Sequence, residues 1–257
     1  MNIYCIADKS LAAQAEYELL KKTYPQLIFE KPSTDEEAIL IVLGGDGYML
    51  YNLHRYMHKP YKFYGMNCGT VGFLLNKFLV ENLIERIKHA ETSIINPLTM
   101  IVETTNNQLH ELLAINEASL FRHTHQAAHL KLSINNQIKM DELVADGILV
   151  ATPAGSSAYN ASAGGPIIPL NAPLLALTPL NSYKPRRWGG ALIPDTVKIQ
   201  LEVLYSDKRP VIATADFQQI EKVKSAKIYQ NNKLKLKLLF DPGHSLEERI
   251  INEQFLI

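Results

Sequence analysis

The hydrophobic pattern of the chain changes at Asn96-Pro97, and this change limits the possible folds more than any other feature. Before it, short apolar runs alternate with segments in which apolar residues recur at helical spacing. The run from Ala38 to Leu43 is continuously apolar, as in a strand of a parallel sheet that is covered on both faces. Residues 1–96 are therefore predicted to form an α/β domain, in which helices flank a parallel sheet.

After the change, apolar and polar residues alternate strictly, as in residues 197–203 and 234–238. This is the period of half-buried antiparallel strands. Asn106-Asn107 and Asn135-Asn136 separate such runs, and asparagine suits the tight turns of hairpins. We therefore expect residues 97–240 to form a mainly antiparallel β domain. Residues 241–257 return to helical spacing, and we expect this tail to pack back on the first domain.

The composition limits the classes of partner. Lysine and arginine total 26, as do aspartate and glutamate, so the formal net charge of 0 provides no general attraction for nucleic acid or anionic membranes. The N-terminus does not resemble a secretory signal, and no apolar run reaches the length of about 18 residues typical of a membrane helix. Two cysteines do not suggest a disulfide framework. We expect a soluble, cytoplasmic protein that binds small molecules, without nucleic-acid or membrane partners.

A glycine-rich bend, Gly44-Gly45-Asp46-Gly47, follows the buried strand. Glycines at such a bend let phosphates approach the backbone. The bend is not a P-loop, because Tyr48 and Met49 replace the required lysine and hydroxyl residue, and Leu50 replaces the last glycine of a Rossmann fingerprint. Taken alone, the bend fits either a kinase that places an aspartate beside the transferred phosphate or a structural turn.

Four more motifs follow in the chain: NCGTVGFL at 67–74, Asn116-Glu117, Asp146-Gly147, and TPAGSSAYNASAGGP at 152–166. Together with the glycine bend they cover nearly the whole chain, and in this order they resemble the NAD kinase family. The resemblance implies an α/β domain followed by a β-rich domain that holds NAD. It also implies transfer of the terminal phosphate of ATP, or in some members of polyphosphate, to the 2′-hydroxyl of the adenosine ribose of NAD, by a homodimer or homotetramer.

The resemblance also implies roles for individual residues. Asp46 becomes the catalytic residue, which orients the ribose hydroxyl and accepts its proton late in the reaction. A carboxylate beside phosphates calls for a divalent cation, and we expect Mg²⁺ held through the phosphates of ATP rather than by a dedicated protein site. The expected phosphate-donor region consists of Gly44, Gly45, Gly47, Asn67, Gly69 and Gly72. The expected NAD-binding residues are Asp46, Gly47, Asn116, Glu117, Asp146, Ala154, Ser157, Ala158, Tyr159, Asn160, Ala161 and Ser162.

Three positions depart from the family pattern. Val144 occupies a place where relatives often carry a basic residue, and Lys139 and Arg187 are the candidate replacements. Tyr48 stands where relatives usually carry threonine, and the sequence assigns it no role. Asp216 and Gln218 resemble a DGQ element in which Phe217 replaces the glycine, so their role stays open.

Two other functions are compatible with part of the chain. A lipid kinase of the type that carries GGDG would explain the bend but leave residues 152–166 unexplained. A non-catalytic NAD(P)-binding sensor would use the dinucleotide residues but would not need Asp46.

Overall fold

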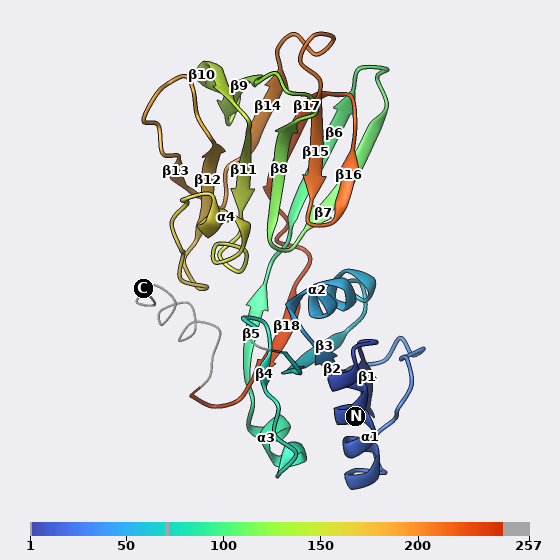
Figure 1. The fold of residues 1–257 in the computed structure, drawn as a ribbon. Coiled ribbons are helices and arrows are strands. Elements are labelled where there is room, and N and C mark those ends of the chain that lie inside the picture. The colour runs from blue at the N-terminus through green and yellow to red at the C-terminus, as the bar shows by residue number, and fades with distance from the viewer. Residues whose placement is uncertain (1, 70–71, 244–257) are drawn as a thin grey trace. The chain divides into compact units, whose positions relative to one another are not determined.

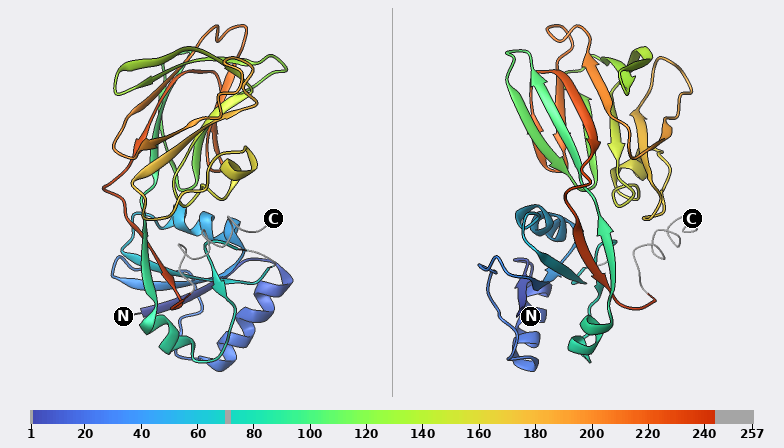
Figure 2. Two further views of the ribbon diagram at one scale, coloured as in Figure 1. Left: turned by 90° about the vertical axis from the view of Figure 1, so that its left-hand side faces the viewer. Right: turned by 180° about the vertical axis from the view of Figure 1, so that it is seen from behind.

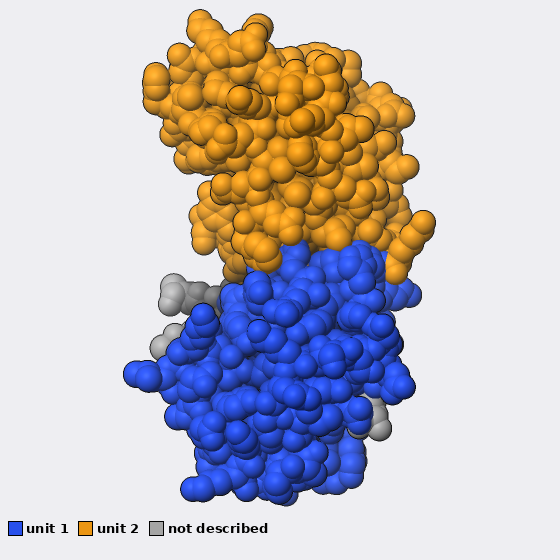
Figure 3. All heavy atoms as spheres, turned by 90° about the vertical axis from the view of Figure 1, so that its right-hand side faces the viewer, with its two compact units in different colours: residues 1–95, 234–257 blue, residues 96–233 orange. Residues whose placement is uncertain are grey.

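The computed structural model describes residues 2–69 and 72–243, and the chain divides into two compact units (Figure 3). Unit 1 contains residues 1–95 together with the residues from Leu234 onward, and unit 2 contains Asn96–Lys233. The second unit is therefore inserted into the first, with one connection near Ile95 and another near Leu234. None of the described helices is long and apolar enough to span a lipid bilayer.

Unit 1 is built on a mixed sheet with the strand order β1-β2-β3-β18-β5 (Figure 1). The strands are β1 (Asn2–Ala7), β2 (Ala38–Gly44), β3 (Tyr61–Asn67), β18 (Leu236–Phe240) and β5 (Glu91–Ile95), with the short β4 (Asn76–Lys77) beside β3. The first three are parallel neighbours, β18 is parallel to β3, and β5 is antiparallel to β18. Every residue of β2 is buried, so the prediction of a parallel sheet around this strand is confirmed.

The helices of unit 1 are α1 (Leu11–Thr23), α2 (Asp46–Arg55) and α3 (Leu83–His89). Helix α1 starts after Ser10, whose hydroxyl accepts a hydrogen bond from the Ala13 amide at 3.4 Å and so caps the helix. Leu20 of α1 and Leu83 of α3 join one apolar core with alternate residues of β2. Burial of these apolar faces, rather than helix propensity, holds the short helices in place.

The assignment of residues 234–240 to the second domain was wrong, because β18 pairs with β3 and β5 in unit 1. The alternation seen in the sequence is real, since Leu236 and Leu238 are buried and Lys237 is exposed. Alternation predicts a strand with two unlike faces but does not identify its neighbours. Beyond β18, Asp241 accepts a hydrogen bond from the Tyr64 hydroxyl at 2.6 Å. The expected packing of the tail concerns residues that, from 244 to 257, lie outside the described part of the chain.

Unit 2 consists of two antiparallel sheets of six strands each, which pack face to face (Figure 2, left). One has the order β10-β9-β14-β17-β6-β7, with bounds Gln137–Ala145, Ala128–Ile134, Ile199–Val203, Val223–Gln230, Leu98–Thr104 and Leu109–Ala114. The other has the order β13-β12-β11-β8-β15-β16, with bounds Ala191–Pro194, Leu174–Leu180, Gly147–Ala151, Glu117–Arg122, Val211–Ala215 and Gln218–Ile220. Both sheets contribute to one apolar core, for example Leu130 and Ile199 from the first and Leu120 and Val150 from the second.

Asparagines form the hairpin turns of unit 2, and an apolar segment covers part of the outer face of its second sheet. Asn107, Asn135 and Asn136 have positive φ values of 60°, 50° and 64°, which confirms the predicted hairpin turns. On the outer face of the second sheet, Leu149 and Ala176 pack against Ile168 of the segment that follows the short helix α4 (Tyr159–Ser162). The glycine- and serine-rich motif at residues 152–166 is thus anchored to the outside of this sheet.

Candidate active site

In unit 1, the glycine bend is the start of a helix. Gly45 is the residue before α2, with an extended backbone at φ −104° and ψ 176°, and Asp46 is the first helical residue. The first turn of a helix presents backbone N–H groups without helical partners and a partial positive charge. Asp46 is the acidic residue of that turn, so the helix stabilises its negative charge. The sequence predicted only a glycine-rich bend here, whereas the structure places Asp46 inside the first turn of α2.

The Asp46 carboxylate also binds the loop that follows β3. Its Oδ2 accepts a hydrogen bond from the Phe73 amide at 2.7 Å, and its Oδ1 accepts one from the Leu74 amide at 2.9 Å. A Cβ atom on Gly72 would lie 3.2 Å from Asp46 Oδ1 and 2.9 Å from Leu75 Cδ1, so glycine lets the loop approach the carboxylate closely. Asp46 is therefore held in one orientation by two segments of unit 1.

The other predicted donor residues lie at the same edge of the sheet. Gly44 is the last residue of β2 and is paired with Asn67, the last residue of β3. The Cys68 amide donates to the Gly44 carbonyl at 3.0 Å, and Asn67 Oδ1 accepts from the Gly69 amide at 2.9 Å. Ligands of open α/β sheets bind at the carboxyl ends of the strands, which is where these residues meet. Residues 70–71 of this motif lie outside the described chain.

Tyr48, which the sequence left unexplained, covers the end of β2. A Cβ atom on Gly44 would lie 3.1 Å from Tyr48 Cδ1 and 3.3 Å from the Cβ of Asp8, the residue after β1. The Tyr48 ring also stacks on Tyr51, with ring centroids 6.5 Å apart and an angle of 16° between the planes. Burial is the main cause that raises the pKa of the Tyr48 hydroxyl above its ordinary value. Its aromatic bulk thus occupies space above Gly44.

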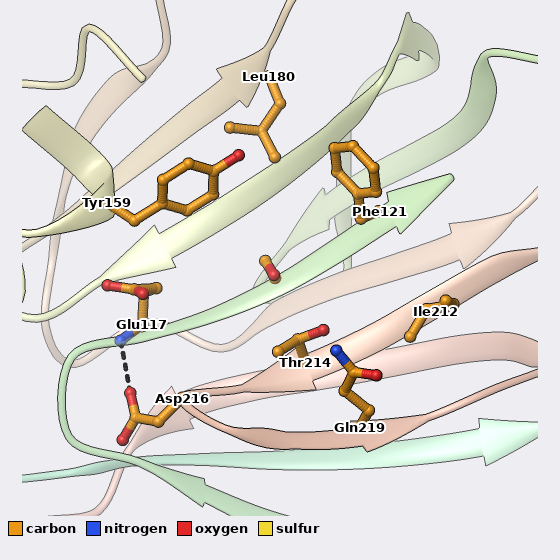
Figure 4. Close-up of a pocket in the computed structure, with 9 residues that line it drawn as sticks. Glu117, Phe121, Tyr159, Leu180, Ile212, Thr214, Asp216 and Gln219 are labelled. Carbon is orange, nitrogen blue, oxygen red and sulfur yellow. Dashed lines mark hydrogen bonds between the residues drawn. The ribbon is translucent and has the colours of Figure 1, made fainter. Parts of the chain in front are cut away.

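Unit 2 contains a cavity of about 260 Å³ on its second sheet (Figure 4). The residues that line it are Glu117, Ser119, Phe121, Tyr159, Leu180, Ile212, Thr214, Asp216 and Gln219. Of these, Glu117 and Tyr159 were predicted to bind NAD. Residues 117, 119 and 121 of β8 lie on one face of the sheet, because side chains alternate along a strand. This spacing was the signal in the sequence for Ser119 and Phe121, which the sequence analysis did not name. Gln219, and not Gln218, is the glutamine that lines the cavity.

Glu117 is the electrostatically unusual residue of this cavity. Its Oε2 atom is buried and has no hydrogen-bond partner among the described residues. Burial, and secondarily the negative charge of Asp216, raises the pKa of the Glu117 carboxyl to about 7. Carboxyl groups with such a shift are concentrated at functional sites. The predicted dinucleotide contact is therefore a group whose charge changes close to neutral pH.

Asp216, whose role the sequence left open, binds the backbone of the corner between β7 and β8. Its carboxylate accepts hydrogen bonds from the amides of Ile115 at 2.6 Å, Asn116 at 3.0 Å and Glu117 at 3.2 Å, the last of which is drawn in Figure 4. Asp216 itself has a positive φ of 50° in the turn between β15 and β16. One side chain thus fixes the corner between β7 and β8 that carries Asn116 and Glu117.

The motif at residues 152–166 is attached to the same corner. The Thr152 hydroxyl donates to the Ile115 carbonyl at 2.7 Å, and the Thr152 amide donates to the Asn116 carbonyl at 2.9 Å. A Cβ atom on Gly155 would lie only 2.2 Å from the Asn116 carbonyl oxygen, so only glycine fits this position. The loop and the corner therefore form one fixed structure.

Asn160 is placed differently from the expected ligand contact. Its side chain is fully buried; its Nδ2 donates to the carbonyls of Ser156 and Pro166 at 3.1 and 2.9 Å, and its Oδ1 accepts from the Thr178 hydroxyl at 2.7 Å. These bonds occupy both donors of the amide, so Asn160 holds the loop rather than offering a donor to a ligand. The remaining motif residues range from buried to exposed: Ala154 is buried, Ser157, Ala158 and Ala161 are half-buried, and Ser162 and Tyr159 are exposed.

Asp146 is bonded to a basic residue that the sequence analysis did not name. Its Oδ1 accepts from Arg122 Nε at 2.5 Å, and its Oδ2 accepts from Asn181 Nδ2 at 2.9 Å. Of the two candidate replacements for a basic residue at position 144, Lys139 donates to Gln137 at 3.0 Å, and Arg187 is exposed with a φ of 69°. Arg122 on the neighbouring strand β8 therefore provides the positive charge beside Asp146.

Known proteins are similar to this chain along most of its length. The family model described as the ATP-NAD kinase C-terminal domain matches residues 115–232. The NAD kinase of Rickettsia bellii is 47% identical over 254 residues, which cover 99% of this chain and 98% of that protein, and that of Rickettsia prowazekii is 48% identical over 258 residues, or 99% of each.

Two solved structures share the fold. Yeast NADH kinase in complex with NADH has a TM-score of 0.81 at 19% identity, over 99% of this chain and 87% of that one. An NAD kinase from Archaeoglobus fulgidus in complex with ATP has a TM-score of 0.77 at 20% identity, over 98% of both chains. These two show the fold, and the rickettsial relatives, nearly half identical along the full length, show that the chain belongs to the NAD kinase family.

Proposed function

We propose that this chain transfers the terminal phosphate of ATP to the 2′-hydroxyl of the adenosine ribose of NAD and so forms NADP. The observation that carries the proposal is the placement of Asp46 on the first turn of α2, with its carboxylate bound by the Phe73 and Leu74 amides at the edge where β2 and β3 end. The rickettsial relatives are named NAD kinases, and the archaeal neighbour is described with ATP.

The proposed chemistry gives Asp46 a late role. The bond between the ribose oxygen and phosphorus forms as the bond between the terminal phosphorus and its bridging oxygen breaks, and ADP leaves. A carboxylate is too weak a base to remove a ribose proton before this step, but it can orient the hydroxyl and accept the proton as the new bond forms. Two backbone donors that fix the carboxylate hold it in place for this task.

Mg²⁺ is the expected cofactor, and it would neutralise charge on the transferred phosphate. Asp8 and Asp46 follow β1 and β2 at the carboxyl edge of the sheet, and carboxylate oxygens are ligands that Mg²⁺ accepts. The residues present therefore fit the cation together with the oxygens of ATP.

The remaining parts of the proposal rest on the family resemblance. The corner at Asn116 and Glu117 and the loop at residues 152–166 would hold NAD, with Asp146 as a further contact. A cytoplasmic homodimer or homotetramer is the expected state of the protein, and polyphosphate is an alternative donor.

A coupled assay tests the proposal. Purified protein is incubated with NAD, Mg²⁺ and ATP, and the NADP formed is measured with an NADP-specific dehydrogenase; parallel samples omit ATP or replace it with polyphosphate. We expect NADP to form with ATP. Binding of NAD without NADP formation would favour the non-catalytic sensor, and phosphorylation of a diacylglycerol in place of NAD would favour the lipid kinase.

A further inference from the structure

We infer that Asn76 and Arg86 position the carboxylate of Asp46 for the reaction, by holding the loop that binds it. The inference rests on the proposed function and adds two positioning residues to it; neither belongs to the motifs that predicted the site. Asp46 accepts hydrogen bonds from the amides of Phe73 and Leu74, so its orientation depends on the path of this loop. The side chains that fix the loop therefore determine how well the carboxylate is held.

The loop leads directly into β4, which lies against β3. A Cβ atom on Gly65 of β3 would lie 2.4 Å from Leu75 Cδ2 and 3.1 Å from the Leu74 carbonyl oxygen, so glycine permits this close approach. Asn76, the first residue of β4, is paired with Met66 of β3. Leu75 alone separates Leu74 from Asn76, so the position of Asn76 limits where the Leu74 amide can lie.

Asn76 joins the loop to two strands of the sheet. Its side chain is fully buried. Its Nδ2 donates to the Gly65 carbonyl of β3 at 3.1 Å and to the Leu239 carbonyl of β18 at 2.9 Å, and its Oδ1 accepts from the Asp241 amide at 2.9 Å. An apolar residue at this position would leave three buried backbone groups without this partner, which is costly in the interior of a protein.

Arg86 of α3 holds the chain just beyond β4. Its Nη1 donates to the Leu79 carbonyl at 2.7 Å, and its Nη2 donates to the Lys77 carbonyl at 3.3 Å. The same guanidinium binds the Asp241 carboxylate, with Nε at 3.3 Å and Nη2 at 2.5 Å. A guanidinium presents five donors in a rigid plane, whereas a lysine would keep the charge but offer one ammonium group on a flexible chain.

Asp241 brings the late strand β18 into the same cluster. Its amide binds Asn76, its carboxylate binds Arg86, and the Tyr64 hydroxyl donates to the carboxylate at 2.6 Å. Burial is the main cause that raises the pKa of the Tyr64 hydroxyl, so this hydroxyl stays protonated and acts as a donor. In the described part of the chain, the Tyr64 hydroxyl joins the cluster through Asp241 alone.

This arrangement separates catalysis from stability. A misplacement of about 1 Å in a reacting group can cost about 100-fold in rate. Loss of a side chain that holds the loop should therefore lower kcat. Loss of the Tyr64 hydroxyl should lower stability, because Asp241 loses a buried hydrogen bond while the loop keeps its own. The KM for NAD should change little in either case, since the expected NAD contacts lie mainly in unit 2.

The test measures kcat, the KM for NAD and the thermal unfolding midpoint of the wild type and three variants. The two loop variants are Asn76→Ala and Arg86→Lys, and the matched control within the cluster is Tyr64→Phe. We expect kcat to fall at least about tenfold in both loop variants, with the KM for NAD within about twofold of the wild type. Tyr64→Phe should unfold at a lower temperature than Arg86→Lys and keep kcat within about twofold. If Asn76→Ala does not fold, Arg86→Lys decides the outcome.

Hydrogen exchange provides a readout that does not depend on activity. Exchange rates are measured for the amides of Phe73 and Leu74, with the Cys68 amide, which donates to the Gly44 carbonyl at 3.0 Å, as an internal reference. We expect faster exchange at residues 73 and 74 in the two loop variants, and unchanged exchange at Cys68 and in the tyrosine variant.

The two readouts separate the inference from the proposed function. If the wild type forms no NADP but exchange changes as expected, the proposed function fails and the link between the cluster and the loop stands. Unchanged exchange at residues 73 and 74 in a folded loop variant would overturn the inference. A kcat that simply follows the unfolding midpoint across all three variants would overturn it as well, because the cluster would then act only on stability.

Discussion

Two acidic residues, one in each unit, are held in opposite ways. Asp46 of unit 1 lies on the first turn of a helix and accepts hydrogen bonds from two backbone amides of the loop after β3. Glu117 of unit 2 has a buried carboxyl oxygen without a partner among the described residues and lies near a second carboxylate. The first site stabilises a negative charge before any ligand arrives, and the second leaves a negative charge unstabilised.

The difference indicates which group each site is prepared for. A carboxylate already fixed by two backbone amides can stand beside phosphates and a cation and take a proton at a late stage. A carboxyl that is costly to ionise gains most from a ligand that brings a positive charge or hydrogen-bond donors. Four predictions test this contrast.

The largest effect is expected for Asp46→Asn. The amide is not a proton acceptor, and its NH₂ group would face one of the two backbone donors that now bind the carboxylate. We expect kcat to fall at least about 100-fold with little change in the Kd for NAD. Steady-state kinetics and a binding isotherm measure the two quantities, and Glu18→Gln, on the exposed side of α1, is the control. Equal kcat values in Asp46→Asn and the wild type would remove Asp46 from the mechanism.

The next effect is expected for Asp216→Ala, which leaves three backbone amides of the corner without their acceptor. Loss of such bonds costs about 1–3 kcal/mol. We expect the Kd for NAD to rise at least about tenfold, while Asp216→Asn, which keeps one oxygen acceptor, gives a smaller rise. An unchanged Kd in the alanine variant would mean that the corner does not depend on Asp216 for its shape.

A stability measurement tests the cost of the Glu117 charge. The pKa in the folded protein, about 7, is above the ordinary value of 4.5, so folding takes up a proton between these pH values. The free energy of unfolding is therefore reduced as pH rises from 4.5 to 7 and stays reduced above 7. Glutamine has no such cost, so Glu117→Gln should be more stable than the wild type by about 3 kcal/mol at pH 8 and equally stable at pH 4.

Denaturant unfolding at the two pH values provides that measurement. A variant that is less stable than the wild type at pH 8 would show that the carboxyl forms a favourable contact that the structure does not contain.

The smallest effect is expected for Arg122→Gln, which removes the cation from Asp146. Arg122 and Asp146 keep 30% and 26% of their side-chain surface exposed, and ion pairs of this kind contribute about 1 kcal/mol or less. We expect a rise of about twofold to fivefold in the Kd for NAD and no change in Lys131→Gln, where the ion pair with Glu202 lies on the other sheet. A loss as large as that of Asp216→Ala would indicate that Arg122 itself contacts the ligand.

The fold was largely predictable because hydrophobic period reports burial directly. The buried run at β2 predicted a parallel sheet, and asparagine pairs predicted hairpin turns whose residues have positive φ. The position of β18 was not predictable in the same way, since its alternation fits a half-buried strand in either unit. Partner choice depends on contacts distant in sequence, which a local pattern does not contain.

The sequence motifs predicted which residues belong to the candidate site, but physical reasoning from the sequence did not predict all of their contacts. The motifs named Asp46 and Glu117, but they assigned Asn160 to the ligand, whereas its amide is used to hold the loop. Motifs mark which residues matter and not whether they act on a ligand or on the chain. Arg122 and Asp216 were missed as partners because each binds residues that lie 24 or about 100 positions away in sequence.

The late position of β18 in the chain has a consequence for synthesis on the ribosome. This strand lies between β3 and β5, yet it follows the whole of unit 2 in sequence. During synthesis, β3 and β5 of unit 1 therefore each keep an unpaired edge until residue 240 has left the exit tunnel. The strands of unit 2 have all been synthesised earlier. Open edges in nascent chains promote aggregation, so this order makes early termination before Leu236 more harmful than the loss of a few residues suggests.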